Sequence, residues 1–387
     1  MAKPLIVYTT NFYPAAEAPH HGIFFQDHAK ALSLIADVAV LHVEIPSWRS
    51  VRRLKPHADT RYDDQVFVWQ GSTPVLSHRF RGRIEKAENE TVRRGLHRIE
   101  REFGKAPDFV IAQNVLPSGK WANLIKQEYG IPFGTIEHFT FLERMLKEQY
   151  DEIVHVYSEA SFISGVSNSV KDLLVGYLPY DQHSKTGVIG NVIGPEFQNH
   201  SLKPPPESEI FKWIFVGPDS FKKGPELLHQ VFSGLKDQNW HLTIVGSGEF
   251  SKFNNDDRLK GRITFLNNLT RHEMIELMQQ HHALISTSHI ETFGMAILEM
   301  MSLGRPVVAT KSGGPQDFVT PSCGILTNVG AADELQKAIS HLQDDYHNYD
   351  PQKIRDHALQ RYGQRVYSER IRNLISVFSD AQLNYDE

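Results

Sequence analysis

Cysteine is almost absent from this chain of 387 residues, in which Cys323 is the only one. A disulfide framework within the chain is therefore excluded, and such sparse use of cysteine suits a reducing compartment. No run approaches the ~20 uncharged apolar residues that a membrane-spanning helix needs. The apolar run after Met1 is too short for a signal peptide. These absences predict a cytoplasmic protein.

An excess of positive charge and a metal-binding cluster are also missing. The formal net charge is -5, which is not the signature of a nucleic-acid-binding protein. Paired aspartates occur only in polar, loop-like surroundings, at 63–64, 256–257 and 344–345. No group of His, Asp and Glu has the spacing of metal ligands. We therefore expect neither a metal nor a cofactor.

Short apolar runs alternate with helical patterns along most of the chain, and this rhythm predicts parallel sheets covered by helices. The length suggests two such domains, and a proline-rich stretch near residue 200 favours a boundary there. We predict a first doubly wound domain over 1–195, a linker over 196–208, a second doubly wound domain over 209–365, and a final helix over 366–387. No repeat of fixed period is present.

The stretch from residue 283 to 315 organises the second half. A buried strand at 283–288 leads through Phe293 and Gly294 into a helical pattern that stops at Gly304, and a second strand at 306–310 ends in Gly313-Gly314. The sequence thus predicts two neighbouring strand-to-helix turns, each with glycine near the start of a helix. Backbone N–H groups at such helix starts bind anions, and parallel sheets bind ligands beyond their carboxyl ends. This pattern indicates a diphosphate site.

Two glutamates flank the first of these turns with seven residues between them. Glu291 precedes the helix, and Glu299 lies about one and a half turns inside it, where a carboxylate suits a ribose diol. An amphipathic helix with two solvated glutamates is the structural alternative. The stretch from Glu291 to Glu299 nevertheless resembles the E-x7-E signature of the retaining, nucleotide-sugar-dependent glycosyltransferases of family 4 (glycosyl transferases group 1). The segments that precede and follow it strengthen the resemblance.

The resemblance implies the GT-B fold: two Rossmann-like domains face each other across a cleft, and a C-terminal helix crosses back to the first domain. It also implies roles for nine residues. The catalytic candidates are His138 and Glu291. The donor-binding candidates are Gly217, Lys223, Phe293, Gly294, Met295 and Glu299, and Gly22 belongs to a loop on the acceptor side.

Two candidates lie in the first half of the chain, and each has a purely structural alternative. Gly22 follows a loop with two prolines and could be an ordinary turn glycine. His138 follows the strand 132–137, so it falls at a carboxyl end, but a lone histidine there is often a core residue. In the family, a histidine at this place contacts the transferred sugar. Glu137 points the opposite way because strand residues alternate.

The sequence departs from the family pattern at Pro218. Family members carry an arginine there, which grips the donor diphosphate together with the lysine that matches Lys223. Proline carries no charge, and the loss of one of two cations weakens the grip by roughly 1–3 kcal/mol. Lys222 or Lys311 are candidates to replace the missing cation.

The region 48–105 is rich in arginine and lysine, with glutamates interleaved in its second part. On a helix this pattern is typical of a solvated, salt-bridged face. The alternative is a cationic surface that contacts anionic lipid, at about 1 kcal/mol for each well-placed Lys or Arg.

By resemblance, we expect a retaining, metal-independent hexosyltransferase with a nucleotide-diphosphate sugar as donor and a saccharide or lipid-linked acceptor. Its expected setting is cell-surface polysaccharide or glycolipid assembly, in the cytoplasm, either free or peripheral at the inner face of the membrane. Two alternatives stay open: an epimerase of the same fold, and a protein that binds nucleotide sugar without turnover.

Overall fold

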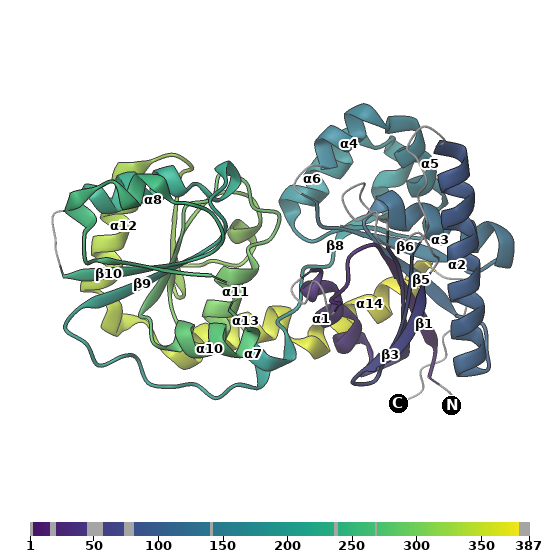
Figure 1. Ribbon diagram of the computed structural model, residues 1–387, viewed down its shortest axis with the longest axis horizontal. Helices are drawn as coiled ribbons and strands as arrows, with labels where there is room; N and C mark the ends of the chain where they lie inside the picture. Colours follow the sequence, from purple (N-terminus) through teal and green to yellow (C-terminus); the bar gives the residue numbers. More distant parts are fainter. Residues whose placement is uncertain are drawn as a thin grey trace. The chain divides into compact units, whose positions relative to one another are not determined.

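The computed structural model describes residues 3–15, 21–44, 57–72, 81–139, 142–235, 239–267 and 269–378. The chain forms two compact units (Figure 1). Unit 1 consists of Met1–Val166, Val170–Val192 and Gln364–Glu387, and unit 2 of Ser167–Ser169 and Ile193–Gly363. The predicted boundaries at residues 195, 208 and 365 stay predictions.

Unit 1 is built on an eight-stranded sheet in the order β3-β4-β2-β1-β5-β6-β7-β8. All neighbouring strands are parallel except β3 and β4, which form an antiparallel edge pair. The order reverses between β1 and β5, which is the switch point of a doubly wound sheet. The strands are β1 (Leu5–Thr10), β2 (Asp37–Glu44), β3 (Ala58–Asp63), β4 (Val66–Ser72), β5 (Phe109–Gln113), β6 (Phe133–Glu137), β7 (Ile163–Gly165) and β8 (Thr186–Val188).

Helices cover both faces of this sheet (Figure 1). They are α1 (Ile23–Leu32), α2 (Arg81–Phe103), the π-turn η2 (Val115–Gly119), α3 (Lys120–Tyr129), α4 (Leu142–Glu148), α5 (Tyr150–Glu159), α6 (Asn168–Tyr177), the 3₁₀ turn η3 (Tyr180–Lys185) and α14 (Gln364–Phe378). The last helix packs on α1, where Ser368 Oγ donates a hydrogen bond of 2.6 Å to the carbonyl of Ala31. The prediction that the C-terminal helix joins the first domain is confirmed.

Unit 2 is built on a six-stranded, wholly parallel sheet in the order β11-β10-β9-β12-β13-β14. Numbered within the unit, this is the 3-2-1-4-5-6 order of the Rossmann fold, with its switch point between β9 and β12. The strands are β9 (Phe211–Val216), β10 (Trp240–Val245), β11 (Ile263–Leu266), β12 (Ala283–Ser286), β13 (Val307–Thr310) and β14 (Gly324–Thr327).

The helices of unit 2 enclose a core in which Trp213, Ile285 and Val308 are fully buried. The α-helices are α7 (Pro195–Asn199), α8 (Pro225–Ser233), α9 (Ser251–Asn254), α10 (Arg271–Gln279), α11 (Met295–Ser302), α12 (Ala332–Asp344) and α13 (Pro351–Tyr362). The 3₁₀ turns are η4 (Phe221–Lys223), η5 (Asp257–Leu259), η6 (Gly314–Asp317) and η7 (Tyr346–Asn348). Two doubly wound domains were predicted from the alternating pattern, and this part of the fold is confirmed.

Three local predictions need correction. The irregular, basic region contains the hairpin β3–β4 and the long helix α2, and β3 was missed because it is a polar, mostly exposed edge strand. The predicted proline-rich linker begins with a helix, α7, which has proline at its first position, where the missing N–H costs nothing. The sequence from residue 350 to 383 predicts one continuous helical stretch, but the described part of it forms two helices, which Gly363 in extended conformation separates.

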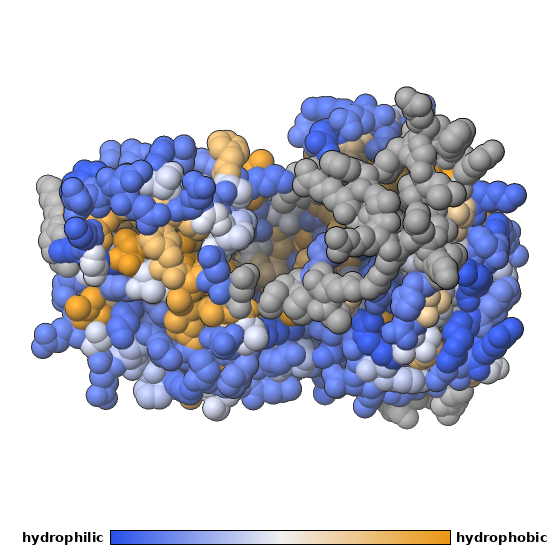
Figure 2. Space-filling view, viewed as in Figure 1, coloured by the Kyte–Doolittle hydropathy of each residue, from blue (hydrophilic) through white to orange (hydrophobic). Residues whose placement is uncertain are grey.

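The surface in view is mainly hydrophilic, with scattered apolar patches (Figure 2). Among the described residues, no helix is long and apolar enough to span a membrane.

Candidate functional site

Three turns meet at the carboxyl edge of the unit 2 sheet, and backbone hydrogen bonds join them. The N–H of His289, after β12, donates to the carbonyl of Lys222 in the turn after β9, at 2.8 Å. The N–H of Glu291 donates to Ser312, after β13, at 2.9 Å, and Gly314 donates back to Glu291 at 2.8 Å. Backbone hydrogen bonds between the turns therefore hold the candidate site of unit 2 in place at the switch point of the sheet.

Glycine is required where these turns approach one another. Gly294 has φ 101° at the N-cap of α11, and Gly313 has φ 122°. A Cβ on Gly314 would lie 2.3 Å from the Cα of Phe293, so any side chain there would collide with the neighbouring turn. The closeness of the two turns explains the glycine pattern that the sequence showed.

The expectation of two paired helix starts is only half right. The first turn opens α11, and no side chain caps its N-terminus, which leaves the N–H groups of its first turn available to a ligand. The second turn opens only the four-residue 3₁₀ turn η6, because the backbone of Phe318 leaves the helical region with φ -140°. A single α-helical N-terminus therefore faces the candidate site from this pair of turns.

A lysine and a glutamate predicted for the site form an ion pair in unit 2. Nζ of Lys223 lies 2.5 Å from Oε2 of Glu291, although the two residues are 68 positions apart. Both side chains are largely buried, with exposed fractions of 28% and 14%. Charge-assisted bonds of this kind are strong when water is restricted. The pair holds a cation beside the uncapped start of α11.

The other donor-side candidates lie around this pair. Gly217 follows β9, and a Cβ there would lie 3.0 Å from Cγ of Lys223, so glycine lets the lysine pass close to the strand end. Met295 is the first residue of α11, and Glu299 lies one turn further on, partly exposed.

Only the main chain of Phe293 lies at the turn before α11, because its ring points into the core. Its ring is 2% exposed, stacks on Phe318 at 5.3 Å and meets the edge of Tyr362 at 5.1 Å. The side chain is therefore part of the core of unit 2, and its role as a donor-binding residue stays a prediction for its backbone.

Pro218 opens the loop after β9, and Asp219 in that loop accepts a hydrogen bond of 2.9 Å from the N–H of Phe250. Lys222 and Lys311, the candidates for the missing cation, are both exposed. Lys311 directly follows β13, at the same edge of the sheet as Lys223.

In unit 1, Gly22 is the N-cap of α1 and adopts the left-handed conformation with φ 72°. A Cβ there would lie 2.6 Å from the carbonyl oxygen of Phe12. The turn itself thus requires glycine, and the role of Gly22 on the acceptor side stays a prediction.

His138 directly follows β6, as the sequence indicated, and is 8% exposed. Its N–H donates to Oδ1 of Asn114 at 3.0 Å, and its Nε2 lies 2.8 Å from Oε1 of Gln113. The rings of Phe24 and Phe25 lie 5.3 and 4.9 Å from the imidazole. Burial lowers the pKa of His138 well below its ordinary value, helped by the nearby His28, so the imidazole is neutral at pH 7.

Glu137, the neighbour of His138, is completely buried on the other face of β6. Burial raises its pKa to about 7, partly offset by the hydroxyl of Tyr157 and the N–H of Val115. Neither carboxyl oxygen has a hydrogen-bond partner of normal geometry within the described residues. Sequence reasoning assigned this residue no function, and its burial was not visible without the tertiary structure.

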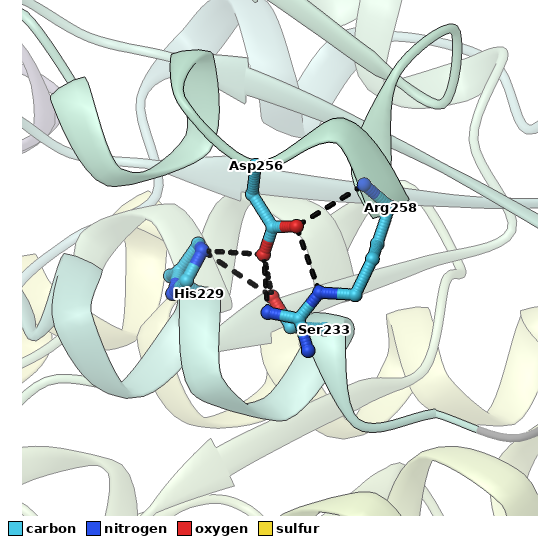
Figure 3. A network of polar contacts seen from close by, with 4 residues as sticks. All are labelled: His229, Ser233, Asp256 and Arg258. Atoms are coloured by element: carbon cyan, nitrogen blue, oxygen red, sulfur yellow. Dashed lines mark hydrogen bonds and ion pairs between the residues drawn. The ribbon is translucent and has the colours of Figure 1, made fainter.

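A second polar cluster in unit 2 looks like a hydrolytic triad but has a different geometry (Figure 3). His229 Nε2 and Ser233 Oγ lie 3.0 and 2.9 Å from the same oxygen, Oδ2 of Asp256, and Arg258 grips both carboxylate oxygens at 2.8 and 2.6 Å. In a serine triad the histidine lies between the serine and the acid. Here all three partners contact the acid, and Ser233 Oγ lies 3.3 Å from the same nitrogen of His229, Nε2, that contacts Asp256. The cluster therefore fastens α8 to the segment around η5.

No group of three or more His, Cys, Asp or Glu residues suited to a metal ion occurs within the ranges that the structure describes.

The two doubly wound sheets define an α/β protein with two Rossmann-like domains, and Lys223 lies at the carboxyl edge of the second sheet. Residues 197–365 match the model of the family glycosyl transferases group 1. The match covers most of unit 2 and less than half of the chain, so it relates the second unit to this family.

Relatives with similar sequences are named as glycosyltransferases. The chain is 24% identical to an uncharacterized glycosyltransferase of Methanocaldococcus jannaschii over 61% of its own length and 65% of the relative. It is 26% identical to a lipopolysaccharide 1,6-galactosyltransferase of Salmonella typhimurium, again over 61% of this chain and 65% of the relative. These alignments cover slightly less than two thirds of each relative.

A solved structure extends the fold comparison to nearly the whole chain. The protein HepE from Anabaena, solved in complex with UDP-glucose, is 18% identical and superposes with a TM-score of 0.70 over 96% of this chain and 99% of its own. This likeness establishes the GT-B fold.

Proposed function

We propose that the protein is a retaining glycosyltransferase that moves a hexosyl unit from a nucleotide-diphosphate sugar to a saccharide or lipid-linked acceptor. The observation that carries the proposal is the Lys223–Glu291 ion pair beside the uncapped start of α11, at the switch point of a Rossmann sheet. A cation and free backbone N–H groups at one edge suit a diphosphate, and an adjacent carboxylate suits sugar hydroxyls.

In the proposed reaction, the bond between C1 of the sugar and the diphosphate oxygen breaks as the acceptor oxygen bonds to C1 on the same face. The proton of the acceptor hydroxyl passes to the departing phosphate. Lys223 and the N–H groups of Gly294 and Met295 stabilise the negative charge that develops on the leaving group. Because these groups are fixed by the fold, the reaction needs no divalent metal.

The other predicted residues complete this scheme. Glu291 binds hydroxyls of the transferred sugar near the reacting carbon, and Glu299 binds the ribose of the nucleotide. His138 contacts the transferred sugar from unit 1, and the loop ending at Gly22 belongs to the acceptor side. Gly217 lets the side chain of Lys223 pass close to the strand end.

The experiment that tests the proposal is an incubation of the full chain with UDP-, GDP- and ADP-sugars, with and without EDTA. Slow release of nucleoside diphosphate that persists in EDTA supports a metal-independent transferase. Turnover that requires magnesium would refute the metal-free scheme, and the absence of release with every donor would refute the transferase proposal.

The same screen separates the two alternatives. An epimerase converts the donor to its isomer without releasing the nucleotide. A binding protein without turnover, which Pro218 favours because it removes one diphosphate cation, shows saturable binding and an unchanged donor.

We further propose that the acceptor belongs to cell-surface polysaccharide or glycolipid assembly and that the protein works in the cytoplasm, with peripheral contact to the inner face of the membrane. The relative from Salmonella acts on lipopolysaccharide, as its name states. The basic region is the candidate contact, although Arg49, Arg52, Arg53, Lys55 and Arg79 lie outside the described residues.

Within the described part of that region, the charges of α2 are partly satisfied by acids. Arg93 grips Glu128 through two bonds of 2.7 and 2.8 Å, and Arg98 pairs with Glu102 at 2.8 Å. These pairs favour the solvated-face alternative for α2 itself. Co-sedimentation with anionic and neutral vesicles distinguishes the two, and equal, negligible binding to both would remove the membrane proposal.

A further inference from the structure

Four buried polar side chains form a continuous row of contacts in unit 1, starting at His138. Nε2 of His138 contacts Oε1 of Gln113 at 2.8 Å, and Nε2 of Gln113 contacts Nδ1 of His28 at 3.3 Å. Nε2 of His28 contacts Oδ1 of Asn191 at 3.0 Å. These side chains come from the end of β6, the end of β5, α1 and the segment after β8. All four are at least nine-tenths buried.

Each contact in this row needs one donor and one acceptor, so the row has a direction. Oδ1 of Asn191 accepts, and the proton of His28 therefore lies on Nε2. Nδ1 of His28 is then an acceptor, which receives an N–H of Gln113. The carbonyl oxygen of Gln113 in turn accepts from His138, so His138 carries its proton on Nε2.

Burial keeps both rings neutral, which is necessary for this coupling. The pKa of His28 is lowered to about 3 by desolvation, and the ring of Tyr367 lies 4.4 Å from it. A neutral imidazole has one N–H only. Reversing both amides would place the proton of His138 on Nδ1, so the tautomer of His138 reports the direction of the whole row.

The last atom of the row is Nδ1 of His138. It is buried and has no hydrogen-bond partner within the described part of the chain. A buried polar atom without a partner is unfavourable and calls for a ligand group or water. In the direction derived above, this atom is an acceptor.

We propose that Gln113, His28 and Asn191 are positioning residues that hold His138 as its Nε2-protonated tautomer and present Nδ1 as a hydrogen-bond acceptor. The group that it recognises is a hydroxyl, which donates its proton; this last step rests on the proposed function, in which a sugar hydroxyl fills that place. The three supporting residues act through the histidine.

The direct test is the nitrogen NMR spectrum of histidine-labelled, full-length protein without donor, assigned with a His138→Gln variant. The expected result is a protonated Nε2 and an unprotonated Nδ1 for His138 at pH 7. A protonated Nδ1 would overturn the proposal. This readout requires no turnover, so it can fail or succeed independently of the proposed transferase activity.

Variants test whether the row sets the tautomer. Gln113→Leu removes the acceptor and should yield a mixture of tautomers at His138, with kcat/KM for donor turnover lowered about 10-fold, as for a lost hydrogen bond. Asn191→Asp keeps an acceptor opposite His28 and should preserve the wild-type tautomer. Gln182→Leu changes another buried glutamine of unit 1, outside the row, and is the matched control for packing.

An unchanged His138 tautomer in folded Gln113→Leu protein would overturn the proposal, as would a change in the Gln182→Leu control equal to that in Gln113→Leu. If Gln113→Leu does not fold, Asn191→Leu gives the same prediction two residues further along the row, and a wild-type tautomer there would also contradict it.

Discussion

Both units are built on doubly wound sheets, but they use the carboxyl edge of the sheet in opposite ways. In unit 2, glycine turns expose backbone N–H groups, and the charged pair Lys223–Glu291 keeps partial access to solvent. In unit 1, the corresponding edge holds neutral side chains that are buried among aromatic rings, as His138 is between Phe24 and Phe25. The fold fixes where a site lies, whereas the local residues decide whether it handles charge or hydrogen bonds.

The largest effect is expected from removing the cation of unit 2. Lys223→Ala should lower kcat/KM for donor turnover by about 100- to 1,000-fold, since it removes a charge from the leaving group and leaves Glu291 unpaired beside the diphosphate. Steady-state kinetics measures this effect. Lys252→Ala, which removes an exposed lysine paired with Glu226, is the control and should be neutral. A loss of kcat/KM below threefold in Lys223→Ala would contradict the view that the edge of unit 2 acts through its charge.

Substitutions of the two candidate glutamates of unit 2, Glu291 and Glu299, should affect different kinetic parameters. Glu291→Ala is expected to lower kcat by about 100-fold with a small change in donor KM, because its contacts strengthen as the sugar reacts. Glu299→Ala should raise donor KM by about 10-fold with kcat nearly unchanged, because a ribose contact is the same before and during reaction. Full activity in both variants would remove these assignments.

The dry character of the unit 1 edge predicts an unusual pH dependence of stability through Glu137. Its pKa is about 7 in the folded chain against an ordinary value of 4.5, so the folded state holds a proton that the unfolded state releases. This contribution is complete below pH 4.5 and is lost as pH rises through 7, by roughly 3 kcal/mol.

Glu137→Gln removes that titration. The difference in unfolding free energy between variant and wild type, measured by urea denaturation from pH 5 to 8, should therefore move in favour of the variant as pH rises. A difference that stays constant over this range would show that the carboxyl group is well solvated and that the contrast between the two edges is wrong.

The smallest effect is a gain. Pro218→Arg restores a second cation to the loop after β9 and should lower the donor Kd by about 10-fold, the equivalent of about 1.4 kcal/mol. Isothermal titration with the donor nucleotide measures it, and Pro218→Gln is the uncharged control. An equal gain in both variants would attribute the effect to the backbone, and no gain with arginine would indicate that Lys222 or Lys311 already supplies the charge.

Much of the architecture was predictable from local pattern. The core strands β1, β5, β9, β12 and β13 are mainly apolar because parallel strands are buried on both faces. The exposed edge strand β3 has no such signal, since its sequence alternates only weakly and is mainly polar. The division of the last helix was also missed, because Gly363 is a single weak signal within a long helical pattern.

For the candidate site, the sequence identified several residues, but it did not show which side chains they contact. The E-x7-E spacing and the glycines marked the turns after β12 and β13, but the pairing of Lys223 with Glu291 depends on two strands that are distant in sequence. The support of His138 was not predicted at all. Gln113 and His28 lie in no motif, and only the contacts made in the folded chain relate them to each other and to Asn191.

The sequence by itself determined the two Rossmann-like domains and the positions of the glycine turns, because hydrophobic period and backbone freedom are local properties. The tertiary structure alone decided which charges pair, which titratable groups are buried and which tautomer a histidine adopts. Those properties depend on the surroundings of a side chain, and the surroundings are built from segments that only the fold brings together.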